Sequence, residues 1–133
     1  MLDIFDAFAT DEKKELEGAW EPIGSGTELL IARAENDNNL RQSLALLEAN
    51  QEQLDTLPED EKRALDRELT LGLMADTILL GWKSLVYKGK TLKYSRDNAI
   101  MLLRHADFRK QVMRLANKRS RYQLVADEAD TKN

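Results

Sequence analysis

Apolar residues recur at helical spacing in the first long segment of the chain. Leu40, Leu44 and Leu47 follow one another at intervals of three or four residues, and Leu54 lies two turns further along nearly the same side. The preceding run "NDNN" supplies candidates for an N-terminal cap. The pattern predicts a helix over about 38–54.

A second helix is predicted directly after it. Pro58 suits the first helical position, and the acidic residues 59–61 complement the positive end of the helix dipole. Residues 71–82 are apolar nearly all round, as in a helix surrounded by others, and Gly81 fits a C-terminal signal. This segment is therefore predicted to be the central helix of the domain.

The best strand signal lies in "AWEPIGSGTELLIARAEN". Two short runs, 19–23 and 27–34, flank a loop with two glycines, which is a common hairpin connection. Pro22 limits the first run to an edge strand, because proline cannot donate a ladder hydrogen bond. The sequence predicts a small β-hairpin near the N-terminus.

Further elements are predicted in the C-terminal half. Lys88-Gly89-Lys90 is bracketed by short apolar runs and is expected to form a small hairpin or an ordered loop. One helix should begin after Ser95 and the next near Asp107, with Tyr122 at its end. The expected fold is mainly α, a helical domain of about four helices with a small N-terminal β-hairpin.

The length of 133 residues is that of one domain. We expect a single domain over residues 1–126 and a polar, disordered tail over 127–133. The acidic N-terminus and the absence of a long apolar run argue against secretion and membrane insertion.

The formal net charge of −4 is unevenly distributed. Residues 1–82 hold 7 Lys/Arg and 19 Asp/Glu, whereas residues 83–123 hold 12 Lys/Arg and 2 Asp/Glu. Such asymmetry indicates either a basic surface for an acidic partner or acidic and basic faces that meet within or between chains.

The residue types give little support to catalysis. There is no cysteine and a single histidine, His105, which lies between two predicted helices and is interpreted as structural. Asp76 lies in the most apolar stretch, so it is expected to reach the surface or to pair with an arginine. We expect no enzymatic activity, no metal site and no cofactor.

A nucleic acid is the alternative partner. The basic segment 83–121 is interleaved with Trp82, Tyr87, Tyr94 and Tyr122, a composition that can bind phosphates and stack bases. No zinc finger, recognition-helix or RNP signature accompanies it, and the acidic first half would repel the same polyanion. This interpretation is therefore kept as the second one.

Four segments together resemble a known family. They are "AWEPIGSGTELLIARAEN", "ADTILLGWKSL", "LKYSRDNAIMLL" and "ADFRKQVMRLAN", and their order and spacing resemble the tail assembly chaperones of long, non-contractile-tailed bacteriophages and prophages. The likeness extends from about Phe8 to Tyr122. The segment 114–121 contains more basic residues than is expected for this family.

The resemblance implies a non-enzymatic chaperone that binds and solubilises the tape measure protein during tail morphogenesis. It implies action in the host bacterial cytoplasm and absence from the mature virion. It also implies, as further partners, tail tube protein and a longer form of the chain made by translational frameshifting. The terminal Thr131-Lys132-Asn133 is compatible with a slippery codon sequence.

A chaperone for a long helix works best in many copies, because many weak contacts add to a strong one. We expect a homo-oligomer in which the basic segment 83–121 of one chain meets the acidic segment 35–76 of the next. The candidate surface for a partner or for self-association consists of Trp82, Leu85, Val86, Lys88, Lys90, Lys93, Arg109 and Arg114. For Trp82 a position in the core is the favoured interpretation, and the partner surface is the alternative.

Overall fold

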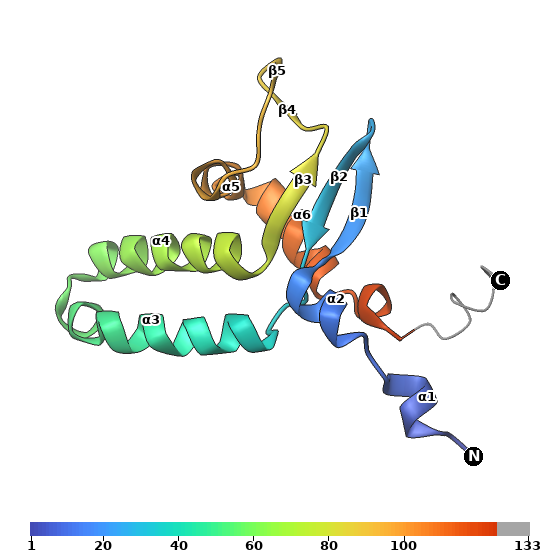
Figure 1. The fold of residues 1–133 in the computed structure, drawn as a ribbon. Helices are drawn as coiled ribbons and strands as arrows, with labels where there is room; N and C mark the ends of the chain where they lie inside the picture. The colour runs from blue at the N-terminus through green and yellow to red at the C-terminus, as the bar shows by residue number, and fades with distance from the viewer. Residues whose placement is uncertain (125–133) are drawn as a thin grey trace.

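A computed structural model describes residues 1–124 and shows a three-stranded sheet from which a long helical hairpin projects (Figure 1). The predicted tail at 127–133 and the possible frameshift site lie outside the described residues. The elements in chain order are α1 (Ile4–Phe8), α2 (Glu12–Glu17), β1 (Ala19–Gly24), β2 (Thr27–Ile31), α3 (Asp37–Thr56), α4 (Glu59–Thr77), β3 (Leu79–Lys83), β4 (Val86–Tyr87), β5 (Lys90–Thr91), α5 (Arg96–Leu103), α6 (Ala106–Ala116) and the 3-10 helix η1 (Arg119–Tyr122).

The N-terminal hairpin is confirmed. Strands β1 and β2 pair antiparallel around a turn in which Gly24, Ser25 and Gly26 all have positive φ. Positive φ is readily adopted by glycine, which explains the glycines on both sides of the serine. A register shift lies between Pro22 and Gly24, on the strand that forms one edge of the sheet.

The predicted fold class is wrong, because the chain forms a mixed α/β structure. The segment expected to end the central helix forms β3, which pairs antiparallel with β2 and gives the order β1-β2-β3. Helix α4 ends at Thr77, and the Ile78 carbonyl accepts a hydrogen bond of 2.8 Å from the Ala32 amide. A helix through residues 79–83 would leave the edge of β2 without these backbone partners, which is costly for buried groups.

Gly81 lies within β3 and does not terminate a helix. It pairs with Leu30, and Leu30 pairs in turn with Trp20 across the sheet. A Cβ at Gly81 would lie 3.6 Å from the Leu30 side chain and 3.9 Å from Trp20. Both are ordinary van der Waals distances, so an alanine at this position would contact these two side chains without displacing them.

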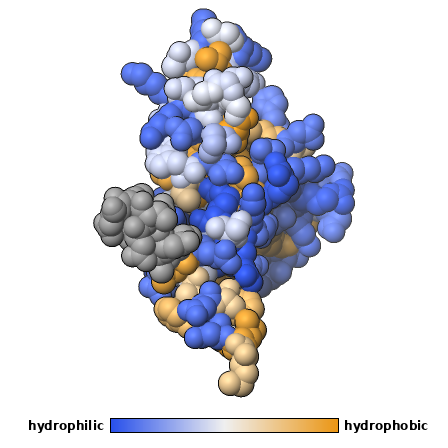
Figure 2. Space-filling model, turned by 90° about the vertical axis from the view of Figure 1, so that its right-hand side faces the viewer, coloured by the Kyte–Doolittle hydropathy of each residue, from blue (hydrophilic) through white to orange (hydrophobic). Residues whose placement is uncertain are grey.

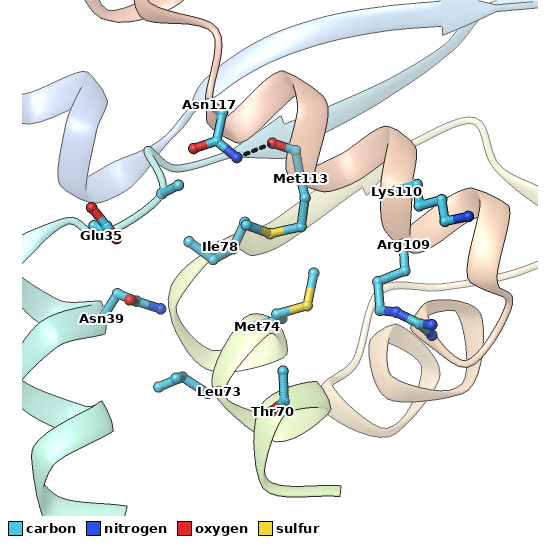
Figure 3. A pocket seen from close by; sticks show the side chains of 11 residues that line it. Glu35, Asn39, Thr70, Leu73, Met74, Ile78, Arg109, Lys110, Met113 and Asn117 are labelled. Carbon is cyan, nitrogen blue, oxygen red and sulfur yellow. Dashed lines mark hydrogen bonds between the residues drawn. The ribbon is translucent and has the colours of Figure 1, made fainter. Parts of the chain in front are cut away.

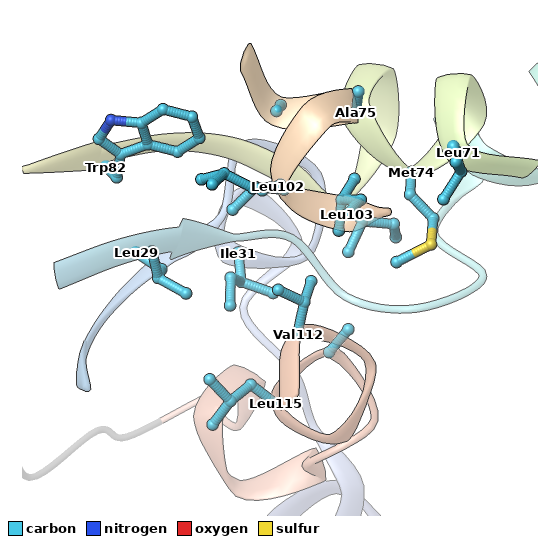
Figure 4. Packing of buried hydrophobic residues seen from close by; sticks show 14 of the residues in the cluster. Leu29, Ile31, Leu71, Met74, Ala75, Trp82, Leu102, Leu103, Val112 and Leu115 are labelled. Atoms are coloured by element: carbon cyan, nitrogen blue, oxygen red, sulfur yellow. The ribbon is translucent and has the colours of Figure 1, made fainter. Parts of the chain in front are cut away.

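The core lies between the sheet and the helices α4, α5 and α6 (Figure 4). Leu29 and Ile31 alternate with Leu30 along β2, so they share the face that packs against the helices. Residues from the other elements complete this core: Leu71, Met74, Ala75, Ile78, Leu79, Trp82, Leu85, Ala99, Leu102, Leu103, Val112, Leu115 and Ala116.

The helix predicted over 38–54 is confirmed as α3. The start of the predicted central helix after Pro58 is confirmed as the start of α4. The Asn36 side chain caps α3 by accepting a hydrogen bond of 2.9 Å from the Asn39 amide. Helix α4 begins after Pro58 with acidic residues in its first turn, as the dipole argument requires.

The predictions for the C-terminal half are confirmed, except for the end of the last helix. The Ser95 hydroxyl caps α5 by accepting from the Asn98 amide at 3.0 Å, and Lys88 and Gly89 form the turn between β4 and β5. Helix α6 ends at Ala116, so Tyr122 belongs to η1 and not to that helix. The short helices α1 and α2 were not predicted.

Tyr122 joins the C-terminal segment to the sheet. Its side chain is fully buried, and its hydroxyl donates a hydrogen bond of 2.9 Å to the Ile31 carbonyl. Its own carbonyl accepts from the Asp11 amide at 2.8 Å. One residue therefore connects β2, η1 and the start of α2.

Alkaline pH should destabilise the fold through its buried tyrosines. Burial raises the pKa of Tyr122 and the pKa of Tyr94, because the phenolate loses hydration in the core. A raised pKa contributes stability that is complete below about pH 10 and is lost as pH rises through the folded-state value. The thermal midpoint of the protein should fall between about pH 9 and about pH 12, and the Tyr122→Phe variant should show a smaller fall over the same interval. Equal pH dependence of both proteins would contradict this.

Within residues 1–124 no helix has both the length and the apolar character needed to cross a membrane.

Candidate partner-binding surface

A groove with an apolar floor separates α4 from α6 near the root of the helical hairpin (Figure 3). Its volume is about 500 Å³, within the usual range for ligand pockets. We call it the deep groove. Its floor consists of Leu73, Met74, Ile78 and Met113, and its other lining residues are Ala34, Glu35, Asn39, Thr70, Arg109, Lys110 and Asn117.

The rim of the deep groove is basic on the side of α6. Arg109 and Lys110 lie there, whereas Glu35 lies at the other end (Figure 3). The Arg109 guanidinium donates a hydrogen bond of 2.7 Å to the Leu103 carbonyl, which fixes its position. Lys110 forms no ion pair with any of residues 1–124. The groove therefore suits an apolar group that carries negative charge beside it.

Helix α3 presents a second apolar surface, which we call the leucine face: Leu40, Leu44 and Leu47. These side chains are 50%, 64% and 52% exposed, and no residue of α3 is buried. The helix packs against α4 and projects with it from the body of the molecule (Figure 1). A stripe of leucines at this spacing is normally covered, so its exposure on a projecting helix indicates a place where a partner binds.

A shallow groove connects the two surfaces. It lies between α3 and α4, has a volume of about 120 Å³, and includes Leu47 of the leucine face. Thr70 and Leu73 line both this groove and the deep groove. The apolar surface therefore continues from α6 across α4 to α3.

The root of the hairpin is held by a small polar network. The Asn36 amide group donates to the Arg33 carbonyl at 2.8 Å and to the Thr77 carbonyl at 3.0 Å. The Asn39 amide group donates to the Thr77 hydroxyl at 2.9 Å. Because Thr77 ends α4 and Asn36 begins α3, these bonds set the angle at which the hairpin leaves the sheet.

The candidate surface predicted from the sequence is not one surface in the structure. Trp82 is only 8% exposed, and its indole N–H donates a hydrogen bond of 2.7 Å to the Leu92 carbonyl. Its ring meets Tyr94 edge-on, with centroids 4.9 Å apart. Leu85 is also buried, so both residues belong to the core.

The other predicted residues are distributed over two regions. Val86, Lys88 and Lys90 lie on the exposed β4–β5 hairpin, and Lys93 follows it. On α6, Arg109 lines the deep groove, and Arg114 is exposed and donates to the Gln111 side chain at 2.7 Å. Arg109 is the predicted residue that the structure places at the deep groove.

Some of the acidic side chains of the first half form ion pairs with basic side chains of the second half within the same chain. Asp76 is exposed and forms a two-pronged contact with Arg96, at 2.7 and 3.2 Å, as the sequence predicted. Glu68 pairs in the same way with Arg104, whose hydrogen bonds lower the pKa of Glu68 while the pKa of Arg104 rises. These pairs attach the acidic α4 to the basic α5.

The aromatic residues do not form a surface for stacking bases. Trp82 and Tyr122 are buried, and the Tyr94 hydroxyl donates to the Leu79 carbonyl at 2.8 Å. Tyr87 is half-buried, and its hydroxyl lies 2.9 Å from Nε2 of His105. Of these four aromatic residues, Tyr87 lies beside a lysine of the β4–β5 hairpin, with Lys88 Nζ 5.6 Å from its ring centre, whereas the other three do not extend this into a row of platforms for bases.

Sequence reasoning missed the deep groove. Its floor combines Met74 of α4 and Ile78, which follows that helix, with Met113 of α6, and no local pattern connects residues so far apart in sequence. The spacing of the leucines on α3 predicted the helix, but spacing does not reveal whether an apolar stripe is covered. Among residues 1–124 no cluster of histidine, cysteine or carboxylate side chains is arranged to hold a metal ion.

The profile of the YdaY prophage protein family matches residues 31–133. The chain belongs to this family. The matched region includes both grooves and the leucine face, whereas α1, α2 and β1 precede it. No curated protein and no solved structure matches the chain. The family relationship identifies a prophage protein without indicating what it binds.

Proposed function

We propose that the protein is a non-enzymatic tail assembly chaperone that binds the tape measure protein and keeps it soluble during tail morphogenesis. The observation that carries the proposal is the uncovered leucine face on a projecting helix. Membership of a prophage family and the resemblance of the four sequence segments to tail assembly chaperones also support it. Tail tube protein and a frameshifted longer form would be further partners in the host bacterial cytoplasm, and the chaperone would be absent from the mature virion.

The leucine face suits an amphipathic helix. Leu40, Leu44 and Leu47 lie within one narrow stripe, and such stripes bind partner helices through side chains at the same spacing. Exposed apolar stripes of a long, unassembled helical protein would otherwise associate with one another. Covering them with one chaperone after another would prevent aggregation through many weak contacts.

The charges around the leucine face indicate which kind of partner helix it prefers. Helix α3 carries four carboxylates and one arginine: Asp37, Glu48, Glu52, Asp55 and Arg41. A partner helix with lysine or arginine beside its apolar stripe would therefore be preferred over an acidic one. Binding should weaken as salt is raised, because exposed charges are screened.

Replacing Leu40, Leu44 and Leu47 together with glutamine should abolish co-purification with the tape measure protein of the same prophage. Glutamine keeps the helix propensity of leucine but removes the apolar stripe. Since these side chains are at least half exposed, the free energy of unfolding should change by no more than about 1 kcal/mol. The measurement is co-expression followed by pull-down, with circular dichroism in urea as the check on folding.

The matched control is the double variant Ala45→Gln and Ala49→Gln on the opposite side of α3, where both residues are exposed. It should retain the tape measure protein. Equal retention by the leucine variant and the control would rule out the leucine face as the binding site. Failure of the unsubstituted protein to retain the tape measure protein would reject the proposed function itself.

A further inference from the structure

The N-terminal segment 1–8, which we call the arm, is an apolar projection that residues 9–124 leave largely exposed. Leu2, Ile4, Phe5 and Phe8 are all more than half exposed, and Phe5 is 67% exposed. Figure 2 shows hydrophobic side chains gathered at the lower end of the molecule, where α1 projects in Figure 1. Such a concentration of apolar surface on one short segment is typical of an interaction site.

The arm is fixed at its base, so it points away from its own body. The Arg119 guanidinium donates to the Ala7 carbonyl at 3.3 Å and lies 4.8 Å from the centre of the Phe8 ring. The Leu124 amide donates to the Ala9 carbonyl at 3.0 Å. These contacts hold α1 beside residues 119–124, at the end of the molecule from which it projects (Figure 1), and its outer residues are exposed.

The arm and the deep groove are complementary in charge. The arm carries Asp3 and Asp6 and no basic side chain, and Asp6 forms no ion pair within residues 1–124. The rim of the deep groove carries Arg109 and Lys110. Opposite charges at the edge of an apolar contact guide association and fix its orientation.

The arm and the deep groove also agree in size and apolar character. The groove holds about 500 Å³, room for a few large side chains but not for a whole helix. Its floor contains Met74 and Met113, and methionine adapts its shape and makes favourable contacts between sulfur and aromatic rings. A phenylalanine from a short helical arm, such as Phe5, is a suitable occupant.

We propose that the arm of one copy inserts Ile4 and Phe5 into the deep groove of a second copy, with Asp6 beside Lys110 and Arg109. Each chain offers one arm and one groove, so the contact is head-to-tail and builds a ring or an open array. The acidic N-terminus of one chain then meets the basic α6 of the next, while the leucine face on α3 stays open. The inference concerns self-association and does not depend on the proposed function.

Sedimentation velocity of the full chain over a range of concentrations at low salt tests the contact. The unsubstituted protein should associate reversibly, and Phe5→Gln, Asp6→Lys and Lys110→Glu should each raise the dissociation constant at least about tenfold. Combining Asp6→Lys with Lys110→Glu in one chain should restore association, because the charges are exchanged. Lys118→Glu, an equal change of charge just beyond α6 and outside the groove, is the matched control and should associate normally.

Disulfide trapping distinguishes this contact from others, since the chain has no cysteine of its own. A Phe5→Cys protein mixed with a Met113→Cys protein should give cross-linked heterodimers under mild oxidation, whereas Phe5→Cys mixed with Val86→Cys should not. A monomer at every concentration would overturn the proposal. So would equal cross-linking of Phe5→Cys to Met113→Cys and to Val86→Cys, or association that survives the arm variants and is lost when the leucine face is replaced.

Discussion

Replacing Trp82 with alanine should lower the free energy of unfolding by about 3–5 kcal/mol. Trp82 is almost fully buried, packs edge-on against Tyr94, and donates a hydrogen bond to the Leu92 carbonyl. Its removal would open a cavity between β3 and the segment before α5, which the surrounding core can refill only in part. Since domains of this size are stable by about 5–15 kcal/mol, the variant should lose a large share of its stability. The measurement is urea unfolding followed by circular dichroism.

Two controls separate packing from partner binding. Trp82→Phe keeps a ring but loses the indole N–H, so it should cost about 1–3 kcal/mol. Trp20→Ala changes a tryptophan that is 41% exposed on the outer face of the sheet, so its cost should be clearly smaller than that of Trp82→Ala. If Trp82→Ala were as stable as the unsubstituted protein but lost a bound partner, the placement of Trp82 in the core would be contradicted.

Replacing Tyr122 with alanine should have an effect of similar size, about 3–5 kcal/mol. The side chain is fully buried, and its hydroxyl satisfies the Ile31 carbonyl on β2. The loss should also loosen the N-terminal segment, because Asp11 donates to the carbonyl of Tyr122 and α1 rests on the residues beside it. Hydrogen exchange at Asp11 and Ala19 should therefore accelerate more than exchange within α4.

The variant Tyr122→Phe isolates the hydroxyl. It keeps the ring in the core and removes one donor to a buried carbonyl, so a cost of about 1–3 kcal/mol is expected. Val86→Ala is the surface control, since Val86 is 61% exposed and its truncation should change stability by less than about 0.5 kcal/mol. Similar costs for Tyr122→Ala and Tyr122→Phe would show that packing of the ring contributes little.

Together these variants separate the apolar residues that stabilise the fold from those that are available for association. Trp82 and Tyr122 stabilise the body of the molecule, whereas the leucine face and the arm contribute little to it because they are exposed. Changes at the two exposed sites should therefore alter association while leaving unfolding nearly unchanged. This separation makes binding experiments with surface variants interpretable.

The sequence predicted the elements whose signals are local. Asn36 and Ser95 cap helices, Pro58 precedes one, and the glycines at 24 and 26 close a hairpin, as their side-chain and backbone chemistry requires. It failed for residues 79–83, where apolar composition fits a buried helix and a buried strand equally well. Pairing with β2, roughly fifty residues earlier in the chain, decided between them.

The candidate site was predicted less well than the fold. Trp82 and Leu85 were named as candidates because they stand beside a basic strip, and both pack inside the core, which for Trp82 was the favoured interpretation. Arg109 was chosen for its charge and does lie at the deep groove, whose floor no sequence pattern had indicated. A groove between α4 and α6 depends on the packing of distant segments, and so does the choice of which apolar stripe remains uncovered.

The sequence alone determined the starts of α3, α4 and α5, the turn of the N-terminal hairpin, the uneven charge and the absence of cysteine, because each of these depends on neighbouring residues or on composition. The tertiary structure alone decided that 79–83 is a strand, that Trp82 is core, and that the leucine face and the arm are exposed. The physical reason is that burial and β-pairing are properties of contacts between distant segments. An apolar residue has the same local signal whether another element covers it or solvent does.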